Sequence, residues 1–177
     1  MQNLSNTSCE PLFSADPGGA APFRSAVRGQ DVCEIEWLVT RAGVFNPEEI
    51  LVAQSLATEA LARGADAGYF FLFADGVEGL DGYTCYGPIP GNAGRFELYW
   101  IAVEPRSKRQ GLAGRLLAAS EQSVRSRSGS HMFAETSSRA DYAAAHALYA
   151  AQGYKLHATV PDYHAAGDDL LIFGKIL

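Results

Sequence analysis

The sequence has few cysteines, no long hydrophobic run and no excess of basic residues. Its three cysteines, Cys9, Cys33 and Cys85, form no C-x-x-C pair and have no histidine spaced to complete a zinc site, which argues against a disulfide scaffold and a structural metal. No apolar run approaches the ~20 residues of a membrane span, and the first residues lack the basic and apolar segments of a signal peptide. We therefore expect a cytoplasmic protein without a metal and without a membrane partner.

Acidic residues outnumber basic ones, 20 against 14, which gives a formal net charge of −6. A protein that wraps nucleic acid normally carries a basic face, so this balance argues against a nucleic-acid partner. The charge is uneven, because residues 106–128 hold six Lys and Arg side chains against Glu121 alone, a local charge of +5 that leaves −11 for the rest. This pattern predicts a basic, phosphate-binding end on an acidic body.

The length of 177 residues and the hydrophobic content of 47% are typical of one globular domain with a substantial core. Residues 1–20 are rich in Ser, Asn, Pro and Gly and contain few large apolar groups to offset the entropy of ordering. We therefore expect a flexible N-terminal arm at 1–20 and the folded domain at 21–177.

Local patterns predict helices and strands in a defined order. Asp31 with Glu34 three residues later suggests a capping box, Asn46-Pro47 combines an N-cap with a proline at the first helical position, and Gly153 ends an Ala-rich helix. The predicted elements are a strand at 22–27, helices at 31–42 and 47–63, strands at 68–76, 80–90 and 95–103, a helix at 111–124, a strand at 131–138, a helix at 141–152, and strands at 154–160 and 169–177. This β-α-α-β-β-β-α-β-α-β-β order indicates a mixed α/β or α+β domain built on one sheet.

The strongest functional signal is a basic loop between a strand and a helix. The strand at 95–103 runs into Glu104-Pro105, and a glycine-containing turn opens directly into an amphipathic helix at Gly111. The first N–H groups of a helix lack intrahelical partners and attract anions, and glycine lets a phosphate approach the backbone. The sequence contains neither the G-x-x-x-x-G-K-[ST] motif of a Walker A loop nor, at this turn, the G-x-G-x-x-G fingerprint of a dinucleotide-binding site. The loop therefore predicts a cradle for another phosphate ligand, with added charge from Lys108, Arg109 and Arg115.

Two motifs in the chain resemble those of the GNAT superfamily of acyl-CoA-dependent N-acetyltransferases. The first motif, V-x-P followed by [QR]-x-x-G-x-[GA], is matched by residues 103–105 and 108–113, with Lys108 in place of the usual Gln or Arg. The second motif, A-x-x-x-Y-x-x-x-G-[FY], is matched by Ala145, Tyr149, Gly153 and Tyr154, while Tyr142 stands where the family often has Asn. The resemblance covers about residues 23–177.

This resemblance implies a GNAT-like single domain, with a mixed, mostly antiparallel twisted sheet of about seven strands flanked by about four helices. It implies that the strands at 96–103 and 131–138 splay apart and that the pantetheine arm of acetyl-CoA lies between them. The residues that would bind this cosubstrate, mostly through their main chain, are Trp100, Ile101, Ala102, Val103, Lys108, Arg109, Gln110, Gly111, Leu112, Ala113, Gly114 and Arg115. Family members are often dimers, so a homodimer is compatible with the resemblance.

Acetyl transfer to an amine requires two proton transfers, one from the amine and one to the departing thiolate. The resemblance implies that Tyr149 is the general acid, although its spacing also suits a core aromatic. Glu97 is our first choice of base, because a carboxylate within an apolar strand is costly unless it faces a cleft or is paired. An outward-facing or salt-bridged Glu97 is the alternative. Glu135 is the second choice, unless Thr136 and Ser137 hold it in a structural role.

The leading hypothesis is an acetyl-CoA-dependent N-acetyltransferase that moves an acetyl group to a primary amine of a small molecule or peptide by direct attack on the thioester. The alternative is a non-catalytic acyl-CoA-binding or sensing module, and a third reading is transfer of a longer acyl group. Asp162, Asp168 and Asp169 either border the acceptor pocket or form a solvated turn. His146, three residues before Tyr149, either lines the site or lies on the surface.

Overall fold

The computed structural model describes residues 23–177, and the N-terminal arm predicted at 1–20 lies outside the described residues. The helices are α1 (Asp31–Ala42), α2 (Pro47–Arg63), α3 (Leu112–Ser126) and α4 (Ala143–Ala151), and the strands are β1 (Phe70–Gly76), β2 (Gly79–Pro88), β3 (Arg95–Val103), β4 (His131–Ser137), β5 (Lys155–Ala165) and β6 (Asp168–Ile176). Short 3-10 turns at Gly64–Ala67, Pro105–Ser107 and Ala140–Tyr142 complete the order. The predicted sequence of elements is confirmed from the first helix onward.

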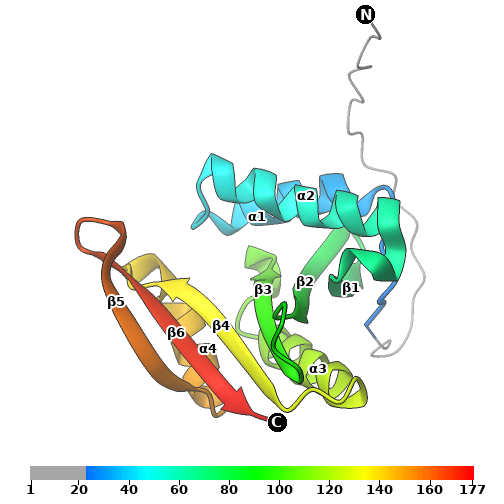
Figure 1. Cartoon of the computed structure of the whole chain (residues 1–177). Helices are drawn as coiled ribbons and strands as arrows, with labels where there is room; N and C mark the ends of the chain where they lie inside the picture. Colours follow the sequence, from blue (N-terminus) through cyan, green and yellow to red (C-terminus); the bar gives the residue numbers. More distant parts are fainter. Residues whose placement is uncertain (1–22) are drawn as a thin grey trace, which may run out of the picture.

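The strands form a single six-stranded sheet in the order β1-β2-β3-β4-β6-β5 (Figure 1). Every neighbouring pair is antiparallel except β3 and β4, which run parallel. The sheet is therefore mixed and mostly antiparallel, as the family resemblance implied. The chain crosses between the two parallel strands through α3, which is how a parallel pair must be connected.

The strand predicted at 22–27 is reduced, within the described residues, to one bridge between Arg24 and Phe73. The backbone N–H and C=O of Arg24 pair with those of Phe73 at 3.0 and 2.7 Å. The carbonyl of Ala26 accepts a hydrogen bond from the Arg24 guanidinium. The expected count of about seven strands therefore becomes six.

The helix ends show which local signals act as predicted. The Asn46 side chain accepts from the Glu49 N–H at 2.9 Å and the Glu49 carboxylate accepts from the Asn46 N–H at 2.7 Å, which confirms a capping box at the start of α2. Gly153 ends α4 with φ +83°, and its N–H and that of Tyr154 return to the last turn in a Schellman arrangement. The capping box predicted at Asp31 is wrong, because its fully buried carboxylate binds Arg24 at 2.8 Å instead of capping α1.

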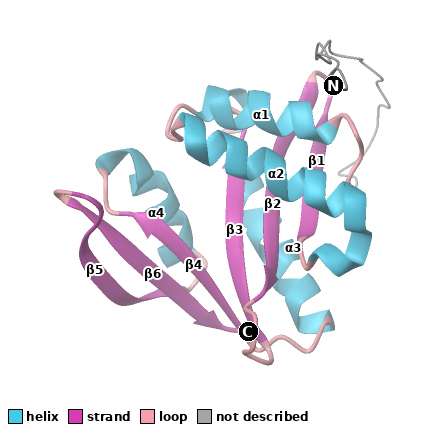
Figure 2. Cartoon of the chain, turned by 45° about the horizontal axis from the view of Figure 1, so that its top comes forward, coloured by secondary structure: helices cyan, strands magenta, loops and turns pink. Residues whose placement is uncertain are grey.

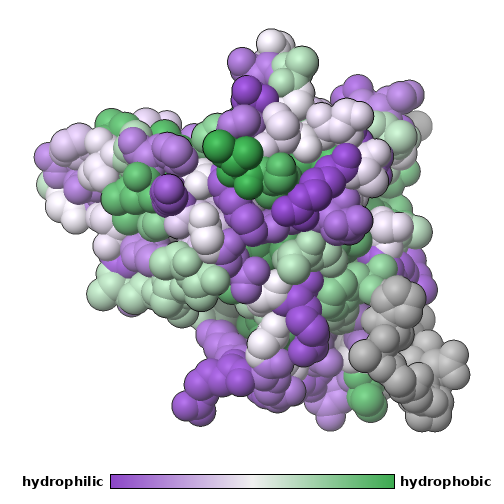
Figure 3. Space-filling view, turned by 90° about the horizontal axis from the view of Figure 1, so that it is seen from below, coloured by the Kyte–Doolittle hydropathy of each residue, from purple (hydrophilic) through white to green (hydrophobic). Residues whose placement is uncertain are grey.

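Helices cover both faces of the sheet. On one face α1 and α2 pack over β1, β2 and β3 (Figure 2). Ile35, Leu38 and Phe73 belong to the apolar core on this face. On the other face α3 and α4 enclose a second core that includes Leu116, Tyr149 and Phe173. β5 forms the edge of the sheet and is exposed along its whole length. Seen from below, hydrophobic residues lie among hydrophilic ones on the surface, and the part of the molecule that carries β5 projects to one side (Figure 3).

The parallel strands β3 and β4 pair over only four positions and then separate. Their register runs from Arg95↔His131 to Leu98↔Ala134, after which β3 continues beside β2 and β4 continues beside β6 (Figure 2). The predicted splay of these strands is thus present in the structure, and it divides the sheet into two arms. Within residues 23–177, no helix is long and apolar enough to cross a membrane.

Candidate active site

The basic loop after β3 is fixed at its base by buried polar contacts. Glu104, 6% exposed, accepts hydrogen bonds from Nε and Nη2 of Arg41 at 3.0 and 2.7 Å, and its N–H donates to the carbonyl of Asp81 at 2.9 Å. Arg106 pairs with Glu78 and Asp81 across the β1–β2 turn. Arg106 therefore anchors the loop to the hairpin, and its charge is already paired.

The loop then leads into a helix start that no side chain caps. Gly111, the N-cap residue of α3, has φ +73°, and Arg109 before it has φ +61°, a left-handed conformation that only a few per cent of non-glycine residues adopt. No side-chain cap bonds to the first N–H groups of α3, at Leu112, Ala113 and Gly114. Uncapped N–H groups and the positive end of the helix dipole are features that attract anions.

The predicted basic side chains differ in what they do at this site. Arg115 donates from Nη1 to the carbonyl of Gln110 at 3.1 Å, and the Gln110 amide donates to the carbonyl of Arg106, so both brace the loop. Lys108 and Arg109 are exposed, and neither pairs with a carboxylate in the described part of the chain. Lys108 and Arg109 are therefore the cations that remain available to a phosphate ligand.

The region between the separated strands fits the pantetheine arm that the resemblance implies. Trp100, Ile101, Ala102 and Val103 all lie beyond the last β3–β4 pair, where β3 has a strand partner on one side only within residues 23–177. On the β4 side, the buried Thr136 Oγ1 has no hydrogen-bond partner among the described atoms. An unpaired strand edge and an orphaned hydroxyl are both suited to a ligand that carries amides.

The two predicted carboxylates lie on one face of the sheet and line one cavity of about 360 Å³. The register places Glu97 beside Phe133, and Glu135 follows two residues later on β4, so both side chains point to the same face. Burial, and secondarily the charge of Glu135, raise the pKa of Glu97 from 4.5 to about 6. Thr136 and Ser137 do not hold Glu135, since Ser137 donates to Asp168 at 2.5 Å and Thr136 Oγ1 is unpartnered among residues 23–177.

Tyr149 lies on the opposite face of the sheet from these carboxylates. It is 4% exposed and packs with Tyr154 and Phe173 at ring-centroid distances of 5.7 and 5.4 Å, in the core that also contains Leu98 and Ala134. Burial raises the pKa of its hydroxyl above the ordinary value, so the phenol stays protonated near neutral pH. Leu98 and Ala134, which form the last β3–β4 pair, belong to the same core as Tyr149.

Other residues that the sequence suggested for the site have local structural partners. His146 bonds through Nε2 to the carbonyl of Ser137 at 2.9 Å and stacks on Phe173. The acids of the β5–β6 hairpin accept hydrogen bonds within it or from β4: Asp162 from the Gly167 N–H, Asp168 from Ser137 and Asp169 from the Asp162 N–H. These acids therefore organise the turn.

Sequence reasoning missed the contacts of the α1–α2 connection. The Phe45 ring lies 4.8 Å from that of Trp100 on β3 and 6.2 Å from that of Tyr142, just before α4. The Tyr142 hydroxyl donates to the carbonyl of Val44 at 3.3 Å, as does the Arg139 guanidinium at 3.2 Å. The connection thus joins the two arms of the sheet beyond the point where β3 and β4 part. The hydrogen bonds from Arg139 and Tyr142 to Val44 join residues 95 and 98 positions apart, and no local pattern signals them.

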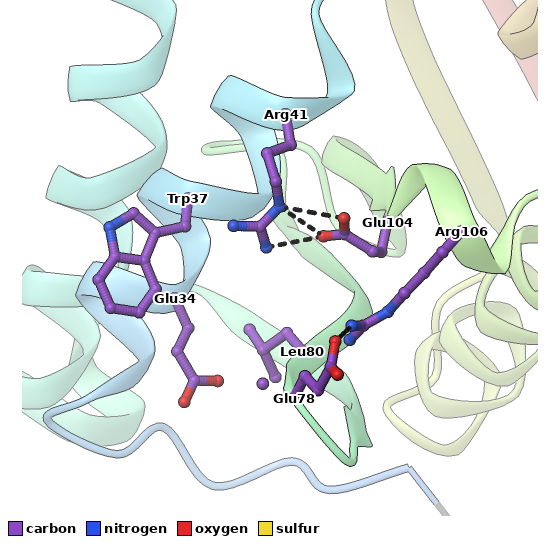
Figure 4. A pocket seen from close by; sticks show the side chains of 8 residues that line it. Glu34, Trp37, Arg41, Glu78, Leu80, Glu104 and Arg106 are labelled. Carbon is purple, nitrogen blue, oxygen red and sulfur yellow. Dashed lines mark hydrogen bonds and ion pairs between the residues drawn. The ribbon is translucent and has the colours of Figure 1, made fainter. Parts of the chain in front are cut away.

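A larger cavity, about 540 Å³, lies between α1, the β1–β2 turn and the start of the basic loop. Trp37, Glu34 and Arg41 line it from α1, Leu80 from β2, and Glu104 and Arg106 from the loop (Figure 4). Arg41 and Arg106 are both engaged by carboxylates there. The Glu97–Glu135 pair lines the smaller cavity and not this one, and Tyr149 lines neither of the two.

Comparisons with known proteins agree with this geometry. The profile of the Acetyltransferase (GNAT) family matches residues 29–154. Among solved structures, a protein from Desulfovibrio desulfuricans described as an acetyltransferase of the GNAT family is 40% identical, with a TM-score of 0.84 over 87% of this chain and 97% of that one. No curated protein matched the chain.

Two more distant structures share the fold. The ribosomal-protein-alanine N-acetyltransferase from Brucella melitensis is 23% identical, with a TM-score of 0.71 over 88% of this chain and 99% of that one. An aminoglycoside 6'-N-acetyltransferase complexed with coenzyme A is 15% identical, with a TM-score of 0.66 over 86% of this chain and 96% of that one. The family profile, the 40% identical structure and the separated β3 and β4 lead to one conclusion: the chain belongs to the GNAT family of acetyltransferases.

Proposed function

We propose that the protein is an acetyl-CoA-dependent N-acetyltransferase, in which a primary amine attacks the thioester directly. The observation that carries the proposal is Glu97, a carboxylate desolvated beside Glu135 at the point where β3 and β4 separate. With its pKa raised to about 6, Glu97 is largely ionised at neutral pH and basic enough to accept a proton. Acetyl-CoA supplies the activated acyl group when bound.

Other residues of the chain bind the cosubstrate, and two side chains transfer protons. The first N–H groups of α3, with Lys108 and Arg109, hold the diphosphate, and the backbone of Trp100, Ile101, Ala102 and Val103 lies along the pantetheine. Glu97 accepts the proton that the ammonium loses, directly or through water. Tyr149 gives a proton to the thiolate as the C–S bond breaks and the C–N bond forms.

The two proton-transfer groups lie on opposite faces of the sheet. Glu97 approaches the separation from the α1–α2 face and Tyr149 from the α3–α4 face. An attacking amine must lose a proton and a departing thiolate must gain one, so the transfer needs a proton acceptor near the nitrogen and a separate proton donor near the sulfur. The opposed positions of Glu97 and Tyr149 support that arrangement.

The test is acetyl transfer to a panel of primary amines, followed by release of free thiol and by product mass. We expect Tyr149→Phe to lower kcat by about a hundredfold or more, as loss of a general acid does, while acetyl-CoA affinity is retained. Tyr69→Phe, a tyrosine of the other core, is the matched control and should keep full activity. Binding of acetyl-CoA without thiol release for any amine would contradict the proposal and favour a non-catalytic acyl-CoA-binding module.

A further inference from the structure

The cavity that contains Glu97 and Glu135 also contains a cation. Arg95 lines it from the start of β3, two residues before Glu97 and on the same face of the strand. Alternate residues of a strand lie about 6.8 Å apart, so a guanidinium and a carboxylate enter the cavity one step apart along β3. The cavity therefore has a negative end and a positive end.

Arg95 forms no ion pair with the described residues of the chain. Its Nη1 donates to Ser130 Oγ at 2.8 Å, and no carboxylate of residues 23–177 lies within 4.0 Å of its guanidinium. Its Nε and Nη2 donate to no described atom, which leaves one edge of the planar fork open. A half-buried guanidinium edge of this kind matches a carboxylate, which it can bind with two parallel hydrogen bonds.

Glu97 and Glu135 are likewise free of a cation within the described part of the chain. Neither takes part in an ion pair there, and Arg95 is directed to Ser130 rather than to them. Phe133 and Ile172 supply apolar walls between the charged ends, and the volume of about 360 Å³ is at the small end of ligand pockets. The cavity thus fits a small molecule with one cationic and one anionic group.

We propose that the acceptor is a small amino carboxylate, whose amine is received by Glu97 and Glu135 and whose carboxylate is bound by Arg95. This inference rests on the proposed function, because it assigns the substrate class of the same site. Arg95 determines specificity and takes no part in proton transfer. Replacing it should change which amines are acetylated and leave the chemistry of transfer intact.

The experiment compares three acceptor series of matched chain length: unbranched ω-amino carboxylates, their primary amides and the corresponding alkylamines. We expect wild-type kcat/KM to be highest for the carboxylates. Arg95→Gln should reduce the ratio of carboxylate to amide kcat/KM about tenfold or more, mostly through KM, because a desolvated charge pair loses one partner. Arg95→Lys, which keeps the charge without the fork, should retain part of the preference.

Two controls separate recognition from structure. Ser130→Ala removes the hydrogen bond from Arg95 but keeps the guanidinium, so the preference should persist. Arg63→Gln removes an exposed arginine that pairs with Glu59 on α2, and it should change nothing. If Arg95→Gln fails to fold, as judged by circular dichroism, the Arg95→Lys and wild-type ratios still decide the question.

The outcomes also distinguish this inference from the proposed function. If amides or alkylamines are acetylated at least as well as carboxylates, or if Arg95→Gln leaves the ratio unchanged, the inference is overturned and the acetyltransferase stands. If acetyl-CoA does not bind, the proposed function itself fails. If acetyl-CoA binds but none of the series is acetylated, calorimetric binding of amino carboxylates to the CoA-saturated protein decides, and absence of such binding overturns the inference.

Discussion

Neutralising Glu135 tests whether Glu97 is the base, because Glu135 raises the pKa of Glu97 by its charge. The Glu97 pKa moves from 4.5 to about 6, a difference of about 1.5, and burial is the larger of its two causes. Glu135 therefore contributes less than half, so Glu135→Gln should lower the Glu97 pKa by less than about 0.7, equivalent to less than about 1 kcal/mol.

The sign of the change follows from the role of the base. Glu97 accepts a proton only when it is ionised, so the wild-type rate should fall as the pH drops through about 6. With Glu135 neutral, ionised Glu97 meets less repulsion, so the acidic limb of the pH–rate profile should move to lower pH. The exposed position of Glu135 means that added salt should move the wild-type limb in the same direction.

The assay is kcat/KM against pH at constant ionic strength, for the wild type, Glu135→Gln and the matched control Glu48→Gln. Glu48 is an exposed acid in the first turn of α2, and its replacement should leave the profile unchanged. A limb that stays in place or moves to higher pH in Glu135→Gln would refute the coupling. Loss of activity at every pH in Glu135→Gln, with Glu97→Gln still active, would assign the base to Glu135.

Two further predictions concern stability and are measured by urea unfolding. Asp31→Asn should lower the free energy of unfolding by about 3 kcal/mol, because it breaks the buried pair with Arg24. The control Glu59→Gln, at an exposed pair, should lower it by no more than about 0.5 kcal/mol. Equal losses in the two variants would contradict the structural role of Asp31. Asn46→Ala should cost about 1 kcal/mol through loss of the N-cap, and an unchanged midpoint would show that the capping box does not form in solution.

Local signals in the sequence predicted the features that depend on neighbouring residues. Asn46-Pro47 and Gly153 mark helix ends in the structure because their partners lie within five residues. Asp31 carries the same kind of signal, but a guanidinium that also reaches Asp75, 51 residues from Arg24, takes its carboxylate. Ion pairing with Arg24 thus takes the place of the predicted local cap.

The candidate site likewise combines features that depend on neighbouring residues with features that depend on long-range contacts. The basic loop and the start of α3 could be predicted because glycine, proline and positive charge act there over a few residues. The shared cavity of Glu97 and Glu135 depends on the parallel register of β3 and β4, which joins residues almost 40 positions apart. The pair between Arg41 and Glu104, 63 residues apart, and the open edge of Arg95 give no local signal at all.

The central claim is that α3 and the separated β3 and β4 bind acetyl-CoA, and calorimetric titration of the purified protein with acetyl-CoA tests it most directly. We predict one site per chain. In a Lys108→Gln, Arg109→Gln double variant the affinity should fall by roughly fivefold, or about 1 kcal/mol for two exposed charges, while Arg63→Gln should bind as the wild type does. Absence of binding at millimolar acetyl-CoA would contradict the account.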